Sequence, residues 1–164
     1  MKASEKTLET ILVVEDEPVV LGIVRAILER SGFRILTAGS GAEAIQLESV
    51  TKETIHLLLS DVMMPDLSGP AVATILKKLR PEMRVMLMSG YPDGGMLFLN
   101  HGWHFIEKPF LAAALVERVT EVLHTPERSQ GNYSYDPRDK PQAPMLEGKR
   151  PEGETNQPAR EQAS

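Results

Sequence analysis

The chain has 164 residues, of which 41% are hydrophobic and 25% are charged. This length fits one globular domain plus additional residues outside it. The composition excludes collagen-like, wholly disordered and membrane-spanning proteins. The N-terminus MKASEKTLET lacks the apolar stretch of a signal peptide, so we expect a cytoplasmic protein with no membrane segment. The absence of cysteine excludes disulfides, zinc fingers and cysteine nucleophiles. A net charge of −5 argues against a nucleic-acid surface, so no direct DNA binding is expected.

Composition divides the chain into three parts. Residues 1–7 are expected to form a flexible N-terminus, and residues 8–125 a folded domain. Residues 126–164 hold six of the twelve prolines, and Leu146 is their only large aliphatic residue. A segment of this kind cannot bury enough apolar surface to offset the entropy lost on ordering. We therefore predict that residues 126–164 are a disordered tail or linker.

Within residues 8–125, short apolar runs alternate with amphipathic stretches. The runs predict strands at 11–14, 33–38, 55–60, 85–88 and 103–106. A helix is predicted from Pro18 to the Ser31-Gly32 step, with Ile23 on its apolar face, and another from the capping pair Ser40 and Glu43 to about Val50. A third helix, with Leu79 on its apolar face, is predicted after Gly69 and ends before Pro81. The fourth is expected to be a short or irregular segment around Gly94-Gly95, and the last covers the apolar positions Leu115 to Leu123.

Strands separated by helices require parallel crossovers, which are right-handed and place helices on both faces of one sheet. The sequence therefore predicts an α/β domain with a doubly wound, five-stranded parallel sheet. Ligands of such sheets bind beyond the carboxyl ends of the strands, near the point where the strand order reverses. The residues at the strand ends are thus the candidates for function.

Five chemically active side chains follow predicted strands. Glu15 and Asp16 come after the first strand, Asp61 after the third, Ser89 after the fourth and Lys108 after the fifth. Clustered carboxylates repel one another unless a cation joins them, and oxygen ligands without His or Cys favour Mg²⁺. An aspartate beside Mg²⁺, with a lysine and a hydroxyl nearby, is equipped to accept a phosphoryl group.

These motifs resemble the receiver domain of two-component response regulators over about residues 8–125. The resemblance is carried by four segments at strand ends: Glu15-Asp16-Glu17-Pro18, Ser60-Asp61-Val62-Met63-Met64-Pro65-Asp66-Leu67-Ser68-Gly69, Ser89-Gly90 and Lys108-Pro109-Phe110. It implies a flavodoxin-like fold with strand order 2-1-3-4-5. It also implies a histidine kinase or phosphotransfer protein as phosphate donor, and an output through an unidentified partner. The chain would be a stand-alone receiver or the terminal receiver of a hybrid histidine kinase.

The resemblance assigns a role to each matching residue. Asp61 would be the phosphoacceptor, Glu15 and Asp16 the acidic pair that binds Mg²⁺ with Asp61, and Met63 a metal ligand through its backbone carbonyl. Lys108 would be the family's lysine at the phosphorylation site. The remaining positions are the switch hydroxyl Ser89, the aromatic switch position Phe105, and the phosphate-adjacent residues Gly90, Met63 and Tyr91.

Two positions and one spacing depart from the family pattern. Glu15 stands where Asp is more common, and Phe105 lacks the hydroxyl of the more usual Tyr. Only 18 residues separate Ser89 from Lys108, which shortens the segment that holds the predicted fourth helix.

Two other functions fit parts of the pattern. One is a Mg²⁺-dependent phosphohydrolase that works through an aspartyl-phosphate, although haloacid-dehalogenase enzymes carry their nucleophile in an Asp-x-Asp pair on the first strand. The other is a pseudo-receiver that binds partners without phosphorylation, which the intact Asp16, Asp61 and Lys108 argue against. As a phosphorylated receiver, the chain is expected not to be an enzyme beyond its own phosphorylation and dephosphorylation at Asp61.

Several polar and apolar side chains have a plainer interpretation. Glu17, Glu43 and Glu48 are expected on solvated surfaces, and His101 and His104 in an exposed loop rather than at a metal. The methionines are expected to fill the core or the rim of the site; these are Met63, Met64, Met83, Met86 and Met88.

Overall fold

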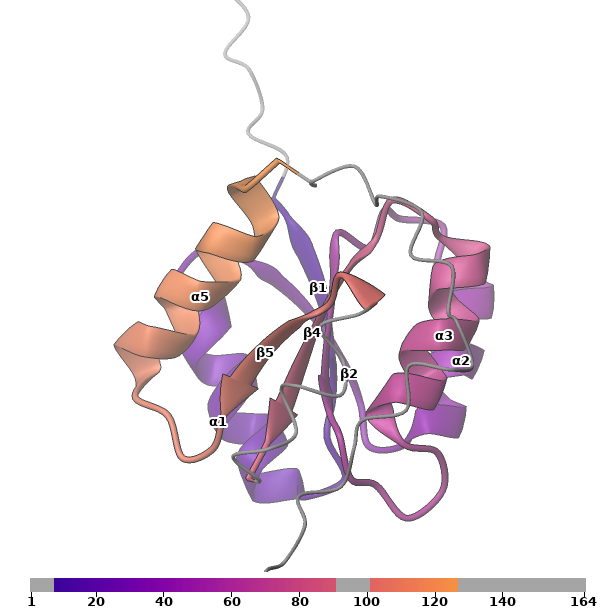
Figure 1. Ribbon diagram of the computed structural model, residues 1–164, viewed down its shortest axis with the longest axis horizontal. Coiled ribbons are helices and arrows are strands. Elements are labelled where there is room, and N and C mark those ends of the chain that lie inside the picture. The colour runs from indigo at the N-terminus through magenta and orange to yellow at the C-terminus, as the bar shows by residue number, and fades with distance from the viewer. Residues whose placement is uncertain (1–7, 91–100, 127–164) are drawn as a thin grey trace, which may run out of the picture. The chain divides into compact units, whose positions relative to one another are not determined.

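The computed structural model describes residues 8–90 and 101–126 (Figure 1). The predictions for residues 1–7, for Tyr91, for the helix around Gly94-Gly95 and for residues 127–164 lie outside these ranges. None of the helices in the described ranges is long and apolar enough to cross a membrane.

The five strands form one parallel sheet. They are β1 (Thr10–Val14), β2 (Arg34–Ala38), β3 (Leu57–Asp61), β4 (Arg84–Ser89) and β5 (His104–Glu107). Their order in the sheet is β2-β1-β3-β4-β5, and every neighbouring pair is parallel. The predicted sheet and its strand order are therefore confirmed. The order reverses between β1 and β3, so the carboxyl ends of these two strands form the switch point.

Helices cover both faces of the sheet, as Figure 1 shows. They are α1 (Pro18–Arg30), α2 (Gly41–Val50), α3 (Gly69–Leu79) and α5 (Ala112–His124). Side chains of β1, β3 and β4 alternate between two apolar clusters, one shared with α1 and α5 and the other with α2 and α3. The central strands are buried on both faces for this reason, which explains why their sequences are continuous apolar runs.

Each of the five strands differs from its predicted range by one or two residues at one end or at both. Ile55 and Trp103 were placed in strands, but β3 begins at Leu57 and β5 at His104. Both side chains are nevertheless buried, with 2% and 8% of their surface exposed. An apolar run in the sequence indicates which side chains are buried. A strand begins at the first residue whose backbone pairs with a neighbouring strand. Here the first buried residue of the run and the first paired residue differ.

Some surface predictions were wrong. Glu48 is not solvated, because it forms an ion pair with Arg80 at 3.1 Å and its side chain is only 13% exposed. Arg80 also donates to the carbonyls of Thr51 and Glu53 at 2.8 Å each, so it ties the end of α3 to the segment before β3. His104 is not in a loop but is the first, half-buried residue of β5.

Two apolar helix positions are more exposed than the pattern predicted. Ile23 and Leu79 are 55% and 57% exposed. In α1 the buried stripe is centred on Val24 and Leu28, and Ile23 lies outside it. The spacing of apolar residues therefore predicts a wider buried face on each helix than the face that packs against the sheet.

The start of α3 lies directly against the end of β3. The Gly69 amide donates to the Val62 carbonyl at 3.1 Å, and a Cβ atom on Gly69 would lie 2.1 Å from the backbone carbonyl oxygen of Asp61. No side chain fits at such a distance from a backbone atom. Glycine is therefore required at position 69 for the chain to pack against Asp61.

We predict opposite effects for two glycine substitutions. Gly69→Ala should lower the free energy of unfolding by about 2 kcal/mol, because the methyl group must displace the backbone of Asp61. Gly22→Ala should raise it by about 0.5–1 kcal/mol, because Gly22 lies inside α1 with no described atom within 4 Å of the added Cβ. Urea denaturation of both variants measures the two effects, and a Gly69→Ala protein as stable as wild type would contradict this packing.

Candidate functional site

The structure brings the strand-end side chains together at the carboxyl edge of the sheet. Asp61 is the last residue of β3, and Glu15 and Asp16 directly follow β1, its neighbour at the switch point. Ser89 is the last residue of β4, and Lys108 directly follows β5. Side chains that are far apart in the chain thus share one edge because the parallel strands all end there.

Lys108 links the two buried carboxylates of this edge. Its Nζ atom donates to Glu15 Oε2 at 2.6 Å and to Asp61 Oδ1 at 3.0 Å. Glu15 is 2% exposed and Asp61 8% exposed. Two carboxylates buried this closely would repel each other without a cation between them, and the ammonium of Lys108 supplies that cation.

Backbone hydrogen bonds extend the sheet to these residues. The Lys108 amide donates to the Ser89 carbonyl at 2.7 Å, and the Glu15 amide donates to the Ala38 carbonyl at 3.1 Å. The Val62 amide, next to Asp61, donates to the Met88 carbonyl at 2.9 Å. Backbone pairing in the sheet therefore fixes the Cα positions from which the side chains of the site extend.

The pKa of Lys108 reflects two opposed effects. Burial lowers the pKa of the ammonium, but the hydrogen bonds and charges of Glu15 and Asp61 outweigh burial, so the pKa is raised above its ordinary value of 10.5. A raised pKa means that the stability from these contacts is fully present below the ordinary lysine value and is lost only as the pH rises through the raised one. Lys108 is thus charged throughout the neutral range.

Three carboxylates of the site are arranged as a cation would require. One oxygen from each of Glu15, Asp16 and Asp61 lies within 4.8 Å of the others, and Asp16 is exposed to solvent. Three carboxylates and one ammonium leave two net negative charges, which a divalent cation would balance. A set of carboxylate oxygens without nitrogen or sulfur fits Mg²⁺.

The other predicted site residues occupy varied environments. Ser89 is buried, and Gly90 is exposed with no described atom within 4 Å of an added Cβ. Phe105 is half-buried against the apolar cluster under α2 and α3, which also contains Trp103. Tyr91 lies outside the described residues.

Met63 is more exposed than expected. Its side chain is 65% exposed, so the prediction that it fills the core or rim was wrong for this methionine. Met64 is half-buried, and the remaining three are buried: Met83, Met86 and Met88. Met63 directly follows Val62 in a loop, where hydrophobicity alone does not produce burial.

Sequence reasoning assigned no role to Asp66. Its carboxylate accepts hydrogen bonds from the first two amides of α2, Gly41 at 3.2 Å and Ala42 at 2.8 Å. The capping pair of α2 was visible in the sequence, and Ser40 does accept from the Glu43 amide at 3.1 Å. That cap leaves the amides of Gly41 and Ala42 without a partner within the helix. Their need for an acceptor was the one indication in the sequence that an acidic residue from elsewhere in the chain would bind them.

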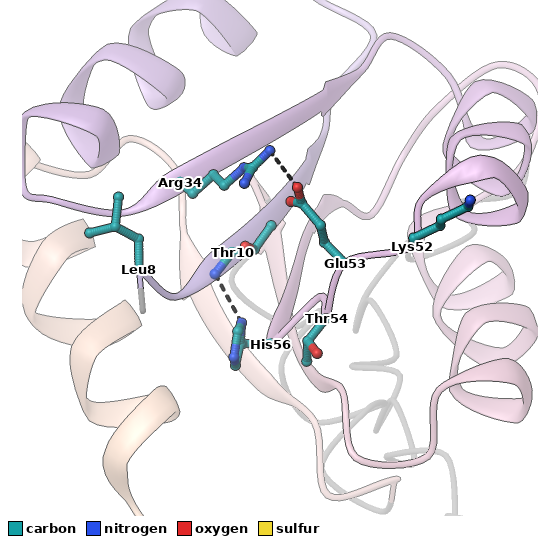
Figure 2. A pocket seen from close by; sticks show the side chains of 7 residues that line it. All are labelled: Leu8, Thr10, Arg34, Lys52, Glu53, Thr54 and His56. Carbon is teal, nitrogen blue, oxygen red and sulfur yellow. Dashed lines mark hydrogen bonds and ion pairs between the residues drawn. The ribbon is translucent and has the colours of Figure 1, made fainter. Parts of the chain in front are cut away.

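A hollow of about 490 Å³ lies at the opposite, amino edge of the strands (Figure 2). Four of the residues that line it pair with one another: Arg34 with Glu53 at 2.7 Å, and the Thr10 amide with Nδ1 of His56 at 2.9 Å. Ligands of open parallel sheets bind at the carboxyl edge. We therefore take the edge with Asp61, and not this hollow, as the functional site.

Comparisons with known proteins identify the family of the chain. The family model for the response regulator receiver domain matches residues 11–120. The sensor kinase CckA of Brucella abortus is 34% identical over 118 residues, which are 70% of this chain and 12% of the kinase. The transcriptional regulatory protein PrrA of Mycobacterium tuberculosis is 35% identical over 116 residues, which are 69% of this chain and 49% of the regulator. The chain thus spans half or less of these two relatives.

Solved structures show the same likeness. A response regulator receiver domain protein from Clostridium thermocellum superimposes with a TM-score of 0.65 at 29% identity, over 71% of this chain and 94% of the other. The receiver domain of the hybrid histidine kinase CckA superimposes with a TM-score of 0.59 at 35% identity, over 70% of this chain and 98% of the other. On its sheet order, its strand-end residues and these matches, the chain belongs to the response regulator receiver domain family, a family of two-component signalling modules.

Proposed function

We propose that this chain is a phosphorylation-controlled switch that accepts a phosphoryl group on Asp61. The donor is a histidine kinase or a phosphotransfer protein, and the output passes to a partner protein. The observation that carries the proposal is the pair of hydrogen bonds from Lys108 to Glu15 and Asp61, beside a carboxylate cluster that fits Mg²⁺.

The arrangement supplies what phosphoryl transfer needs. An oxygen of Asp61 forms the new bond to phosphorus while the bond from phosphorus to the donor's nitrogen breaks. Mg²⁺, held by Glu15, Asp16, Asp61 and the Met63 carbonyl, would neutralise phosphoryl oxygens. Lys108 then exchanges its bond with Asp61 for one with a phosphoryl oxygen, and Ser89 donates its hydroxyl to another. Gly90 leaves space at the end of β4.

The switch follows from the change at Ser89 and the nearby ring. Phe105 lies on β5 beside β4, with its position paired to Leu87. A shift of Ser89 toward the phosphoryl group would free space that Phe105 can enter, and a ring that changes its burial alters the surface presented to a partner. Phe105 has no hydroxyl, so this switch depends on packing alone.

The other possible functions make different predictions. A phosphohydrolase would turn over a small phosphate ester, and a pseudo-receiver would not be phosphorylated. Under the present proposal the chain is not an enzyme beyond its own phosphorylation and dephosphorylation. It works in the cytoplasm without binding DNA directly, as a stand-alone receiver or as the last receiver of a hybrid kinase.

The first test is phosphorylation itself. Incubation with Mg²⁺ and an acyl phosphate should add one phosphoryl group, and Asp61→Asn should abolish the addition because the amide oxygen is a poor nucleophile. Asp136→Asn is the matched control, because it makes the same change in the predicted tail and should leave labelling unchanged. Intact-mass measurement reads both results, and undiminished labelling of Asp61→Asn would contradict the assignment.

A second prediction concerns the charge balance at Lys108. Lys108→Met should lower the free energy of unfolding by about 2 kcal/mol without Mg²⁺, because it leaves the buried carboxylates of Glu15 and Asp61 without a cation. Mg²⁺ should restore part of the loss, while phosphorylation should remain impaired. Lys78→Met, on the exposed side of α3, is the control and should behave as wild type. Urea denaturation with and without Mg²⁺ measures the effect, and an equal loss in both conditions would contradict it.

A third prediction concerns the lifetime of the phosphorylated form. The positions two residues after Asp61 and two after Ser89 flank the path of the attacking water in receivers, and here they are Met63 and Tyr91. Met63 offers no strong hydrogen bond to orient a water, and Tyr91 is bulky. Met63→Asn combined with Tyr91→Glu should therefore shorten the lifetime by about tenfold. Decay followed by intact mass after removal of the phosphodonor tests this, and an unchanged rate would place the control of water elsewhere.

A further inference from the structure

Asp66 connects the loop after Asp61 to a different helix. This β3–α3 loop comprises residues 62–68 and lies between β3 and α3. The Asp66 carboxylate crosses from the loop to α2 and accepts both the Gly41 amide, at 3.2 Å, and the Ala42 amide, at 2.8 Å. The first two amides of α2 have no partner within the helix, and the positive end of the helix dipole favours a carboxylate there.

The remaining bonds at the start of α2 stay within α2 and its cap. Ser40 accepts from the Glu43 amide at 3.1 Å, and the Glu43 carboxylate accepts from the Gly39 amide at 2.7 Å. These two bonds stabilise the helix end without contacting the β3–α3 loop. Asp66 is thus the residue that joins the loop to the first turn of α2 by side-chain hydrogen bonds.

Packing at the same place shows that the contact is close. A Cβ atom on Gly41 would lie 2.6 Å from the Cβ atom of Leu67 and 2.8 Å from Cγ2 of Val72. Gly41 therefore allows α2 to approach Leu67, the residue after Asp66, more closely than any side chain would permit. The hydrogen bonds of Asp66 and the small size of Gly41 thus both stabilise the contact between the β3–α3 loop and α2.

The β3–α3 loop is also held at its ends. The Val62 amide donates to Met88 and the Val62 carbonyl accepts from Gly69, so the two ends of the loop are bonded to β4 and to each other. Between these ends, Met63 and Pro65 are exposed. Met64 and Leu67 of the loop are half-buried against the apolar cluster of α2 and α3, and Asp66 adds a hydrogen-bonded attachment to α2.

We propose that Asp66 is a positioning residue for the metal site, which it serves by holding the β3–α3 loop against α2. The inference rests on the proposed function, in which Met63 of this loop supplies a backbone carbonyl to Mg²⁺. Asp66 touches neither the metal nor the phosphoryl group. Its loss leaves every metal ligand present but removes the hydrogen bonds that hold the middle of the loop to α2, so the carbonyl must be ordered further when the metal binds.

The protonation state of Asp66 is consistent with this role. The hydrogen bond from the Ala42 amide is the main cause of a lowered pKa, and the amides of Leu67 and Gly41 act in the same direction. The carboxylate is therefore ionised, and able to accept both amides of α2, at neutral pH.

Two substitutions remove the contact from its two sides. Asp66→Ala deletes the acceptor. Ala42→Pro deletes the donor of the 2.8 Å bond and leaves Asp66 in place, and a proline is tolerated in the first turn of a helix. The chain already has a Gly-Pro pair at the equivalent positions of α3, where Gly69 and Pro70 are the first two residues. Glu43→Ala is the matched control, because it removes one bond at the start of α2 that does not reach the loop.

The measurement is the dissociation constant of Mg²⁺ by titration calorimetry, at a temperature where circular dichroism shows each variant to be folded. Residues that orient metal ligands typically change metal affinity by 10- to 100-fold when removed. We expect Asp66→Ala to weaken Mg²⁺ binding by about tenfold, Ala42→Pro to weaken it by about threefold or more, and Glu43→Ala to change it by less than about twofold.

The outcomes separate this inference from the function on which it rests. If the wild-type protein binds Mg²⁺ and is phosphorylated, but Asp66→Ala and Ala42→Pro both bind Mg²⁺ within about twofold of wild type, Asp66 is only a helix cap and the inference is wrong. An equal weakening in Glu43→Ala would also overturn it, because fraying of α2 would then be sufficient. A wild-type protein that neither binds Mg²⁺ nor is phosphorylated would overturn the proposed function as well.

Discussion

The functional edge of this protein depends on one ammonium shared by two buried carboxylates. Lys108 lies 93 residues after Glu15 and 47 after Asp61, and it contacts both within hydrogen-bonding distance. Because the three residues belong to the ends of β5, β1 and β3, the two contacts also join the sheet across its carboxyl edge. The same negative charge that requires Lys108 makes this edge suitable for a divalent cation.

The surroundings of Asp61 combine a fixed backbone with an accessible side. Gly69 packs against the Asp61 carbonyl, and the amide of Val62 extends the pairing of β3 with β4. Asp16 is exposed beside the buried Glu15, so the cluster opens to solvent on one side. At the amino edge, by contrast, Arg34 and Glu53 pair with each other. The charges of Arg34 and Glu53 at the amino edge thus neutralise each other, whereas the carboxyl edge keeps a net negative charge.

The sequence predicted which residues lie at the functional edge but not how they pair. Alternation of apolar runs and helices is enough to place Glu15, Asp61 and Lys108 at strand ends, because parallel strands must all end at the same edge. The bond between Lys108 and Glu15 was not predictable, because β4 and β3 lie between β5 and β1 in the sheet and the contact depends on how far the Lys108 side chain reaches past them. The prediction that Glu48 is solvated was wrong for a similar reason. Its partner Arg80 is 32 residues away in the chain, and a glutamate in a helix without a nearby partner is predicted to be exposed.

By itself, the sequence determined the class of fold, the order of elements and the chemical types gathered at one edge, since these follow from local periodicity and from the rules of parallel sheets. Only the tertiary structure decided where strands begin, which apolar faces are covered, and which carboxylates are paired. It also revealed Asp66, whose amide partners lie 25 and 24 residues earlier in the chain. Such contacts join segments through space, where distances of a few ångströms decide whether a hydrogen bond exists, and no local pattern encodes those distances.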